Sequence, residues 1–203
     1  SIDYSFIPNE YQMLRDTLVI DNIRMENFRL DLNLNEFERF YNFCTNAFFQ
    51  IENLLNYYYY RRFPDFDDFI EYLKNIPRSS YEYKKEHKSI SDIPIATKIY
   101  SFNIEKLPHP DHNNKKYNQD NFNIDNLRKI RNEGFHRCSV IQTNKKEDAI
   151  LYNFFKYQTF DTIRNTIVNI SREFLDAAGA HHEAVATIEN LETWSLEDDK
   201  AAA

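Results

Sequence analysis

The chain has 203 residues and a mass of 24.5 kDa, a length that favours one domain with its own hydrophobic core. Phe and Tyr are abundant, at 17 and 14 residues, whereas two Gly and six Pro leave few positions for tight turns. This composition argues against a β-sandwich or barrel and indicates helices. The net charge of −7 argues against a protein that coats nucleic acid non-specifically.

The cysteine count and the hydropathy pattern bear on location. Cys44 and Cys138 lie far apart in sequence; one disulfide could join them, but their spacing matches neither a disulfide framework nor a metal site. A reducing compartment therefore fits best. No stretch approaches the roughly 20 apolar residues that cross a membrane, and no signal peptide is visible. We expect a cytoplasmic protein with no membrane partner.

We divide the chain into an N-terminal flanking element (1–34), a helical bundle (35–178) and a C-terminal extension (179–203). The flanking element has two interpretations. Residues 9–18 fit a short helix. Alternatively, apolar residues at every second position fit a half-buried strand, with a hairpin turn at 21–22. These alternating residues are Phe28, Leu30, Leu32 and Leu34. The last residues, SLEDDKAAA (195–203), could derive from cloning, so we do not use them to predict the fold.

The strongest helix signal covers residues 35–62, where apolar residues recur at steps of three and four. Asn35 fits an N-cap with Glu38 three residues on, and Pro64 ends the helix. The run Tyr57–Tyr60 favours a helix end that wraps the core over a stacking platform for bases. The apolar stripe consists of Phe37, Phe40, Tyr41, Cys44, Ala47, Phe48, Ile51, Leu54, Leu55 and Tyr58.

Four further helical or loop segments follow from similar patterns. Residues 65–75 predict a short amphipathic helix, 78–88 a polar loop, and 94–106 a helix that begins at Pro94. Residues 108–114 predict a loop. His109 and His112 lie in that loop, and because no further ligands can be placed beside them we expect neither a metal nor a cofactor.

Two helices complete the predicted bundle. One runs from about 124 to 141 with Asn123 as a possible cap, and its core face carries Ile124, Leu127, Ile130, Gly134, Cys138 and Ile141. The other is a single long helix over 147–178 that ends at Gly179. The predicted fold is an all-α antiparallel bundle of about five helices, in which helices 35–62 and 147–178 bracket helix 124–141.

Positive charge is concentrated around that bracketed helix. Residues 113–146 contain eight basic and three acidic residues, a net charge of +5, which leaves −12 for the rest of the chain. A solvated basic face would look the same as an RNA-binding face. The candidate RNA-binding residues are Lys129, Arg128, Arg137, Lys115 and Lys116.

Arg131, Asn132 and His136 form the candidate catalytic group. Asn132 and His136 are i, i+4 neighbours that point away from the core, whereas Arg131 lies inside the apolar arc. The Arg131 side chain could therefore reach out to the polar side, or lie half-buried against a carboxylate of another helix. Histidine can transfer protons near neutral pH, and a guanidinium stays charged and matches phosphate oxygens. Such a set suits metal-free cleavage of RNA by its own 2′-OH.

The sequence LRKIRNEGFH, residues 127–136, resembles the signature of the HEPN superfamily (higher eukaryotes and prokaryotes nucleotide-binding). That signature is an Arg, a polar residue, a few further residues and a His; here the spacing is Arg-x4-His with Asn in the polar slot. The layout of residues 35–178 is also similar: a long aromatic-rich helix first, the motif late, and one more long helix after it. One position departs from the subgroup paired with a nucleotidyltransferase antitoxin, which has Tyr where Cys138 stands.

This resemblance implies an all-α bundle that dimerises so that two motifs face one composite cleft. It further implies a metal-independent endoribonuclease, active in toxin–antitoxin or antiviral defence, that leaves 2′,3′-cyclic phosphate and 5′-OH ends on single-stranded RNA. Arg131 and His136 would then be catalytic and Asn132 would support them. An antitoxin or regulatory partner is compatible with this role.

Two other interpretations stay open. The chain could be a non-catalytic helical module that binds nucleotide, RNA or a protein, with Arg131 in a structural ion pair. It could also be one domain of a larger effector.

Overall fold

A computed structural model describes residues 2–76, 86–106, 115–136 and 152–177, and the side chains of 115–118, 133–136 and 174–177 are not described. This part of the chain is all-α, without a strand, as the sequence predicts. Its helices are α1 (Gln12–Leu30), α2 (Glu36–Arg62), α3 (Phe66–Asn75), α4 (Ile95–Lys106), α5 (Lys115–His136) and α7 (Phe160–Ala177). Short 3₁₀ turns lie at Asn9–Tyr11 and Ile90–Asp92.

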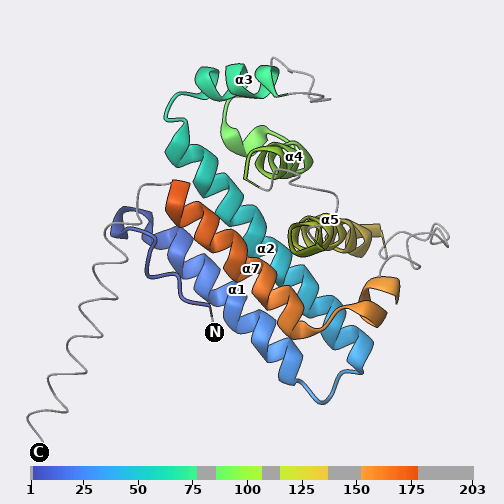
Figure 1. Ribbon diagram of the computed structural model, residues 1–203. Helices are drawn as coiled ribbons and strands as arrows, with labels where there is room; N and C mark the ends of the chain where they lie inside the picture. Colours follow the sequence, from blue (N-terminus) through green and yellow to red (C-terminus); the bar gives the residue numbers. More distant parts are fainter. Residues whose placement is uncertain (1, 77–85, 107–114, 137–151, 178–203) are drawn as a thin grey trace, which may run out of the picture.

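Helix α2 lies at the centre of the fold, in contact with α1, α5 and α7 (Figure 1). Its apolar stripe forms the core that these helices cover, and each fully buried Leu, Ile or Phe stabilises the fold by about 1.5–3 kcal/mol. Helices α2 and α7 both contact α5, but they also pack against each other, so α5 lies to one side of them and the predicted bracketing is not present. The buried stripe of α2 consists of Phe40, Phe43, Cys44, Ala47, Phe48, Ile51, Leu54, Leu55 and Tyr58.

The predicted start of α2 is confirmed in atomic detail. The Glu38 backbone N–H donates to Asn35 Oδ1 at 2.9 Å, and the Asn35 N–H donates to Glu38 Oε2 at 3.2 Å. This reciprocal capping box satisfies donors that the first helical turn would leave unpaired. The helix ends at Arg62, just before the Phe63-Pro64 step that the sequence predicts as its limit.

Residues 12–30 of the N-terminal element form one continuous helix, α1, so the strand and hairpin interpretation is wrong. Asp21 and Asn22 are buried within α1 and do not form a turn. Leu18 and Met25 point into the common core, whereas Ile20 and Ile23 are exposed. Apolar residues on two opposite faces of α1 hide its helical period, which explains the error. Among the described helices, α1 and α2 form the pair with the most extensive contact.

The second long helix, predicted over 147–178, is interrupted at 158–159. The chain is helical over 152–157 and again over α7, which begins at Phe160. Thr159 caps α7: its Oγ1 accepts from the Thr162 N–H at 3.2 Å, and the Thr159 N–H donates to Thr162 Oγ1 at 2.9 Å. Tyr157, the last residue before the interruption, is 70% exposed.

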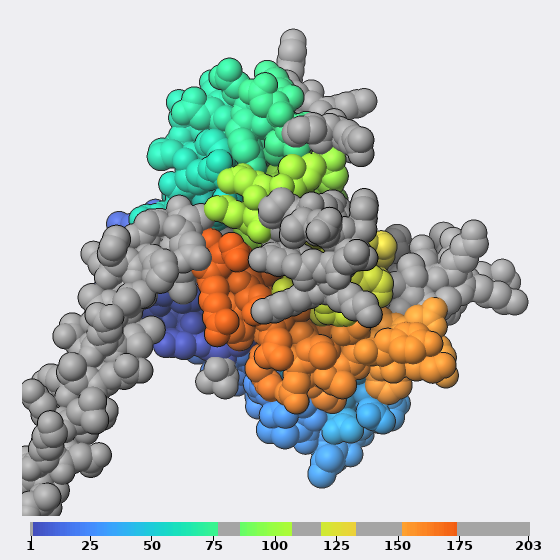
Figure 2. Space-filling view, viewed as in Figure 1, coloured from blue at the N-terminus to red at the C-terminus, as the bar shows by residue number. Residues whose placement is uncertain are grey.

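Helices α3 and α4 lie together at one end of the molecule, opposite the α1–α2 connection (Figure 2). Their positions agree with the predicted helices 65–75 and 94–106, and the Asp65 carboxylate caps α3 by accepting from the Asp67 N–H at 2.9 Å. Most of the predicted loop 78–88 and all of 108–114 lie outside the described residues. Among the described helices, none is both long and apolar enough to cross a bilayer.

Candidate functional site

The candidate site lies on α5, which begins nine residues earlier than predicted. Asn123 is inside this helix, so its predicted role as an N-cap is wrong. Its amide Nδ2 donates to Thr166 Oγ1 at 2.8 Å, and Asp120 accepts from Thr166 Oγ1 at 2.8 Å and from Asn169 Nδ2 at 3.0 Å. Polar side chains thus fasten the first half of α5 to α7. No local sequence pattern could reveal these contacts between segments more than 40 residues apart.

The core face of α5 matches its prediction where the structure describes it. Ile124, Leu127 and Ile130 are fully buried. Cys138 and Ile141, the last predicted members of that face, lie outside the described residues. The buried face fixes the rotation of the helix and so decides where Arg131 and Asn132 project.

Arg131 lies half-buried against α2. Its Nη2 donates to Glu52 Oε2 at 3.3 Å, its Nη1 donates to Asn132 Oδ1 at 3.1 Å, and its Cζ lies 6.0 Å from the centre of the Phe48 ring. A quarter of the Arg131 side chain stays exposed. Of the two predicted environments, the structure has the carboxylate of another helix, and Glu52 is a residue that the sequence did not single out.

The structure orients two members of the candidate trio and leaves the third undescribed. Asn132 is half-buried beside Arg131. Helix α5 continues through His136, so positions 132 and 136 lie one turn apart on the same helix face. The His136 side chain is not described.

The candidate RNA-binding residues are partly engaged within α5 itself. Arg128 Nη2 lies 3.0 Å from Asp125 Oδ1, and Lys129 Nζ lies 2.5 Å from Asp125 Oδ2. The two cations therefore share one carboxylate, whose pKa they lower against the opposing effect of its burial. The side chains of Lys115 and Lys116 are not described, and Arg137 lies outside the described residues.

A buried lysine, absent from the sequence interpretation, adjoins this region. Lys98 of α4 is almost fully buried, and its Nζ lies 2.5 Å from Asn56 Oδ1 and 2.9 Å from the Ile90 carbonyl oxygen. Burial lowers the pKa of Lys98 to about 8, although Glu52 and Asp92 attract its charged form. Glu52 therefore pairs with Arg131 and also favours the charged form of Lys98. The apolar pattern of this helix gave no sign that Lys98 points inward.

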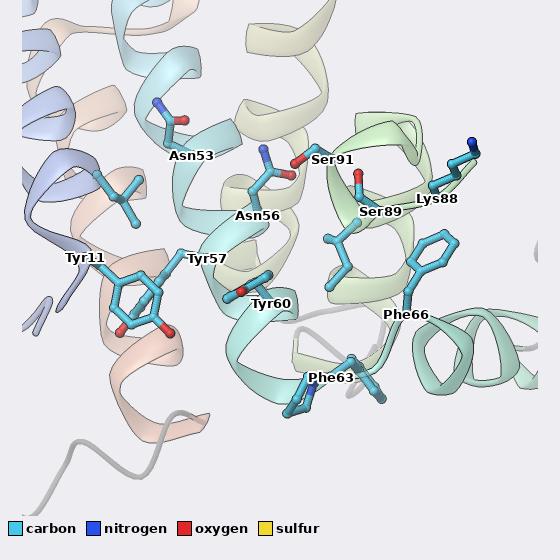
Figure 3. A pocket seen from close by; sticks show the side chains of 13 residues that line it. Tyr11, Asn53, Asn56, Tyr57, Tyr60, Phe63, Phe66, Lys88, Ser89 and Ser91 are labelled. Carbon is cyan, nitrogen blue, oxygen red and sulfur yellow. The ribbon is translucent and has the colours of Figure 1, made fainter. Parts of the chain in front are cut away.

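Asn56 also lines an open pocket of about 590 Å³ (Figure 3). Tyr57 and Tyr60 of α2 and Tyr11 border it on one side, and the segment that contains Ser89 borders it on the other. Its size and its mixture of aromatic and polar groups are those of small-molecule sites in general. Within the Tyr57–Tyr60 run, the first three residues are buried, as predicted, and Tyr60 is exposed to this pocket.

The described residues contain no group of three or more His, Cys, Asp or Glu side chains placed to hold a metal ion. Comparisons of the chain with protein-family models, with curated proteins and with solved structures each give no significant match.

Proposed function

We propose that this protein is a metal-independent endoribonuclease that cleaves single-stranded RNA to 2′,3′-cyclic phosphate and 5′-OH ends. The observation that carries the proposal is the placement of Arg131: Asn132 and Glu52 hold its guanidinium at the end of α5 that also carries His136. The HEPN-like motif, Arg-x4-His, supplies the same three residues. The proposed setting is the cytoplasm, in a toxin or antiviral-defence role with an antitoxin or regulatory partner.

The proposed chemistry needs a base, an acid and a cation. One histidine takes the proton of the ribose 2′-OH while the 2′-oxygen forms a bond to phosphorus. The bond from phosphorus to the 5′-oxygen breaks, and a second histidine donates a proton to that leaving oxygen. His136 of each copy in a homodimer would supply the two histidines. Arg131 stabilises the charge of the pentacoordinate phosphate, and Asn132 orients the guanidinium.

The first prediction is that His136→Ala lowers RNA cleavage at least about 100-fold, because a positioned general acid or base contributes about 10²–10⁴-fold. Cleavage of single-stranded RNA is measured in excess EDTA, and the ends are identified by their reactivity toward a kinase and a phosphatase. His87→Ala is the matched control and keeps full activity. An inactive wild type on a range of RNAs, or equal cleavage by His136→Ala, would sink the proposal.

A second candidate function is favoured by a different aspect of the same contact. The ion pair of Arg131 with Glu52, together with its contact with Phe48, fastens α5 to α2. Such a contact suits a non-catalytic helical module that binds nucleotide, RNA or a protein partner. In that case Arg131 acts only through the fold, and removal of Glu52 has the same effect on RNA binding as removal of Arg131.

Substitutions of Glu52 and Arg131 distinguish the two candidate functions. Under the endoribonuclease proposal, Glu52→Gln keeps substantial cleavage because the guanidinium stays in place, whereas Arg131→Gln abolishes it. Under the module interpretation neither variant has a cleavage activity to lose, and both weaken ligand binding to a similar degree. Melting temperatures of the two variants, measured alongside, correct for a shared loss of folded protein.

A further inference from the structure

Helix α1 carries apolar side chains on two opposite faces. Leu18 and Met25 are fully buried against α2. On the far side, four large apolar residues face solvent: Met13 is 86% exposed, Ile20 47%, Ile23 52% and Leu30 63%. A helix at the edge of a folded domain normally has polar residues on its outer face. A contiguous apolar stripe there marks an interaction surface.

The exposed stripe follows the spacing of a two-helix seam. Its positions are 13, 16, 20, 23, 27 and 30, which repeat every seven residues and alternate steps of three and four. That repeat keeps one side of a helix against a partner helix along its whole length. Two of the six positions are polar, Asp16 and Asn27, and both are exposed.

The stripe is complementary to itself in the antiparallel direction. When two copies of α1 cross near residues 21–22, Met13 faces Leu30 of the second copy and Ile20 faces Ile23. The two polar positions then meet each other, because Asp16 faces Asn27, whose amide can donate to the carboxylate. A two-fold axis repeats each of these layers. We propose that the exposed face of α1 binds a second copy of this chain through an antiparallel, two-fold α1–α1 contact.

Charges beside the stripe are already paired within each copy. Arg29 Nε lies 2.9 Å from Glu26 Oε2, and Arg164 of α7 lies 2.6 Å from Glu26 Oε1. Arg24 lies 3.5 Å from Asp21. Association along the seam therefore buries no block of like charge, and no existing ion pair has to break. The order of apolar and polar positions along the stripe is symmetric about residues 21–22. A second copy of the chain needs this symmetry, whereas a partner of a different sequence does not.

The extent of the seam sets its strength. Residues 13–30 span about 27 Å of helix, at 1.5 Å per residue. One helix pair of that length lies at the small end of specific interfaces, which places the dissociation constant in the micromolar range or weaker. In Figure 1, α1 lies across α2 and α7 from α5. The α1 contact is therefore separate from any composite site formed by two α5 helices, and it goes beyond the proposed function.

The first test is the concentration dependence of mass, measured by sedimentation equilibrium from about 5 to 500 µM. Wild type is expected to dimerise, and Ile23→Glu to weaken the dimer at least tenfold, because each substitution enters the two-fold contact twice. Ile104→Glu, at an exposed apolar position on α4, is the control and changes nothing. A wild type that stays monomeric throughout, or association that Ile23→Glu leaves unchanged in extent, overturns the proposal; a smaller complex that persists in Ile23→Glu supports it, because that complex comes from the separate α5 contact.

The second test addresses the direction and the polar layer. Asn27→Asp places two carboxylates opposite each other and weakens the dimer, whereas Asn27→Lys pairs with Asp16 and strengthens it in low salt. Opposite shifts at one exposed position cannot arise from a change in folding alone. In a Cys138→Ser background, chains with Met13→Cys and with Leu30→Cys form a mixed disulfide when combined. If Met13→Cys instead cross-links to itself, the antiparallel arrangement is wrong.

Discussion

Helix α2 makes two arginine–glutamate pairs with later helices, and they differ in the hydrogen bonds that join each pair. Arg62 binds both carboxylate oxygens of Glu105 on α4, and Tyr72 Oη donates to the same carboxylate at 2.6 Å. Arg62 also donates to Tyr58 Oη at 2.9 Å, and its Cζ lies 5.1 Å from the Phe63 ring centre. These contacts therefore join α2, α3 and α4 to one another.

In the pair of Glu52 with Arg131 of α5, Arg131 Nη2 lies 3.3 Å from Glu52 Oε2, and Arg131 Nη1 donates to Asn132 Oδ1 at 3.1 Å. The Arg131 Cζ lies 6.0 Å from the centre of the Phe48 ring. In the first pair, one arginine nitrogen contacts both oxygens of Glu105 and a tyrosine donates to the same carboxylate, so the charges join two helices. An arginine whose contact with its carboxylate is as long as 3.3 Å can exchange that carboxylate for a phosphate at lower cost. This difference indicates that Arg62 stabilises the fold, whereas Arg131 is suited to bind a ligand.

The largest effect on stability is expected from Glu105→Ala. The substitution removes the acceptor for Arg62 and Tyr72, and we expect it to lower the free energy of unfolding by about 3 kcal/mol. This is the low end for a buried pair because both side chains are about a third exposed. Urea unfolding measures the change, with Glu71→Ala on the exposed side of α3 as the control. A loss no larger than that of Arg131→Ala would remove the contrast between the two pairs.

An intermediate effect is expected from Lys98, which lies between the two pairs. Burial lowers its pKa from 10.5 to about 8, so between these values the unfolded chain binds more protons than the folded one. Stability from this group therefore rises with pH, by about 2 kcal/mol between pH 7 and pH 10. Because tyrosines also titrate there, the quantity to measure is the difference in unfolding free energy between wild type and Lys98→Met. A difference that does not change with pH would contradict the lowered pKa.

The smallest effect on stability is expected from Arg131→Ala, at about 1 kcal/mol, because its contact with Glu52 is long, at 3.3 Å, and both side chains keep about a quarter of their surface in solvent. Arg131→Lys should recover most of that stability, since an ammonium can still meet Glu52, but not RNA cleavage, since the guanidinium fork is lost. Unfolding curves and cleavage assays on the same preparations check both expectations. Recovery of cleavage by lysine would show that the fork geometry is irrelevant.

Local signals in the sequence predicted most of the helical architecture. Asn35, Glu38 and Pro64 marked both ends of α2. The signals at α2 succeed because capping and chain-breaking act within a few residues, whereas the Asp65 cap of α3 was not predicted: residue 65 was placed inside that helix. Local signals failed where an interaction over a longer distance decided the outcome. Thr159 looked like one more residue of a continuous helix, and Asn123 looked like a cap although it bonds to Thr166.

The candidate site was predictable to a similar degree. The helical wheel placed Arg131 at the apolar edge of α5, and its half-buried position follows from that placement. The identity of its partner did not follow, because Glu52 lies 79 residues earlier on another helix. Lys98 was missed for the same reason: its partners, Asn56 and the Ile90 carbonyl, are set by how α4 packs.

The short connection between α1 and α2 has a consequence for the order of folding. Only residues 31–35 separate these two helices, so closing them into a hairpin costs little chain entropy. The contacts of Arg131 with Glu52 and of Arg164 with Glu26 span 79 and 138 residues. Because distant contacts form late, we expect α5 and α7 to dock onto a hairpin that already exists. During synthesis, the part of the α2 stripe that α5 and α7 cover stays exposed to solvent until these two helices have left the ribosome.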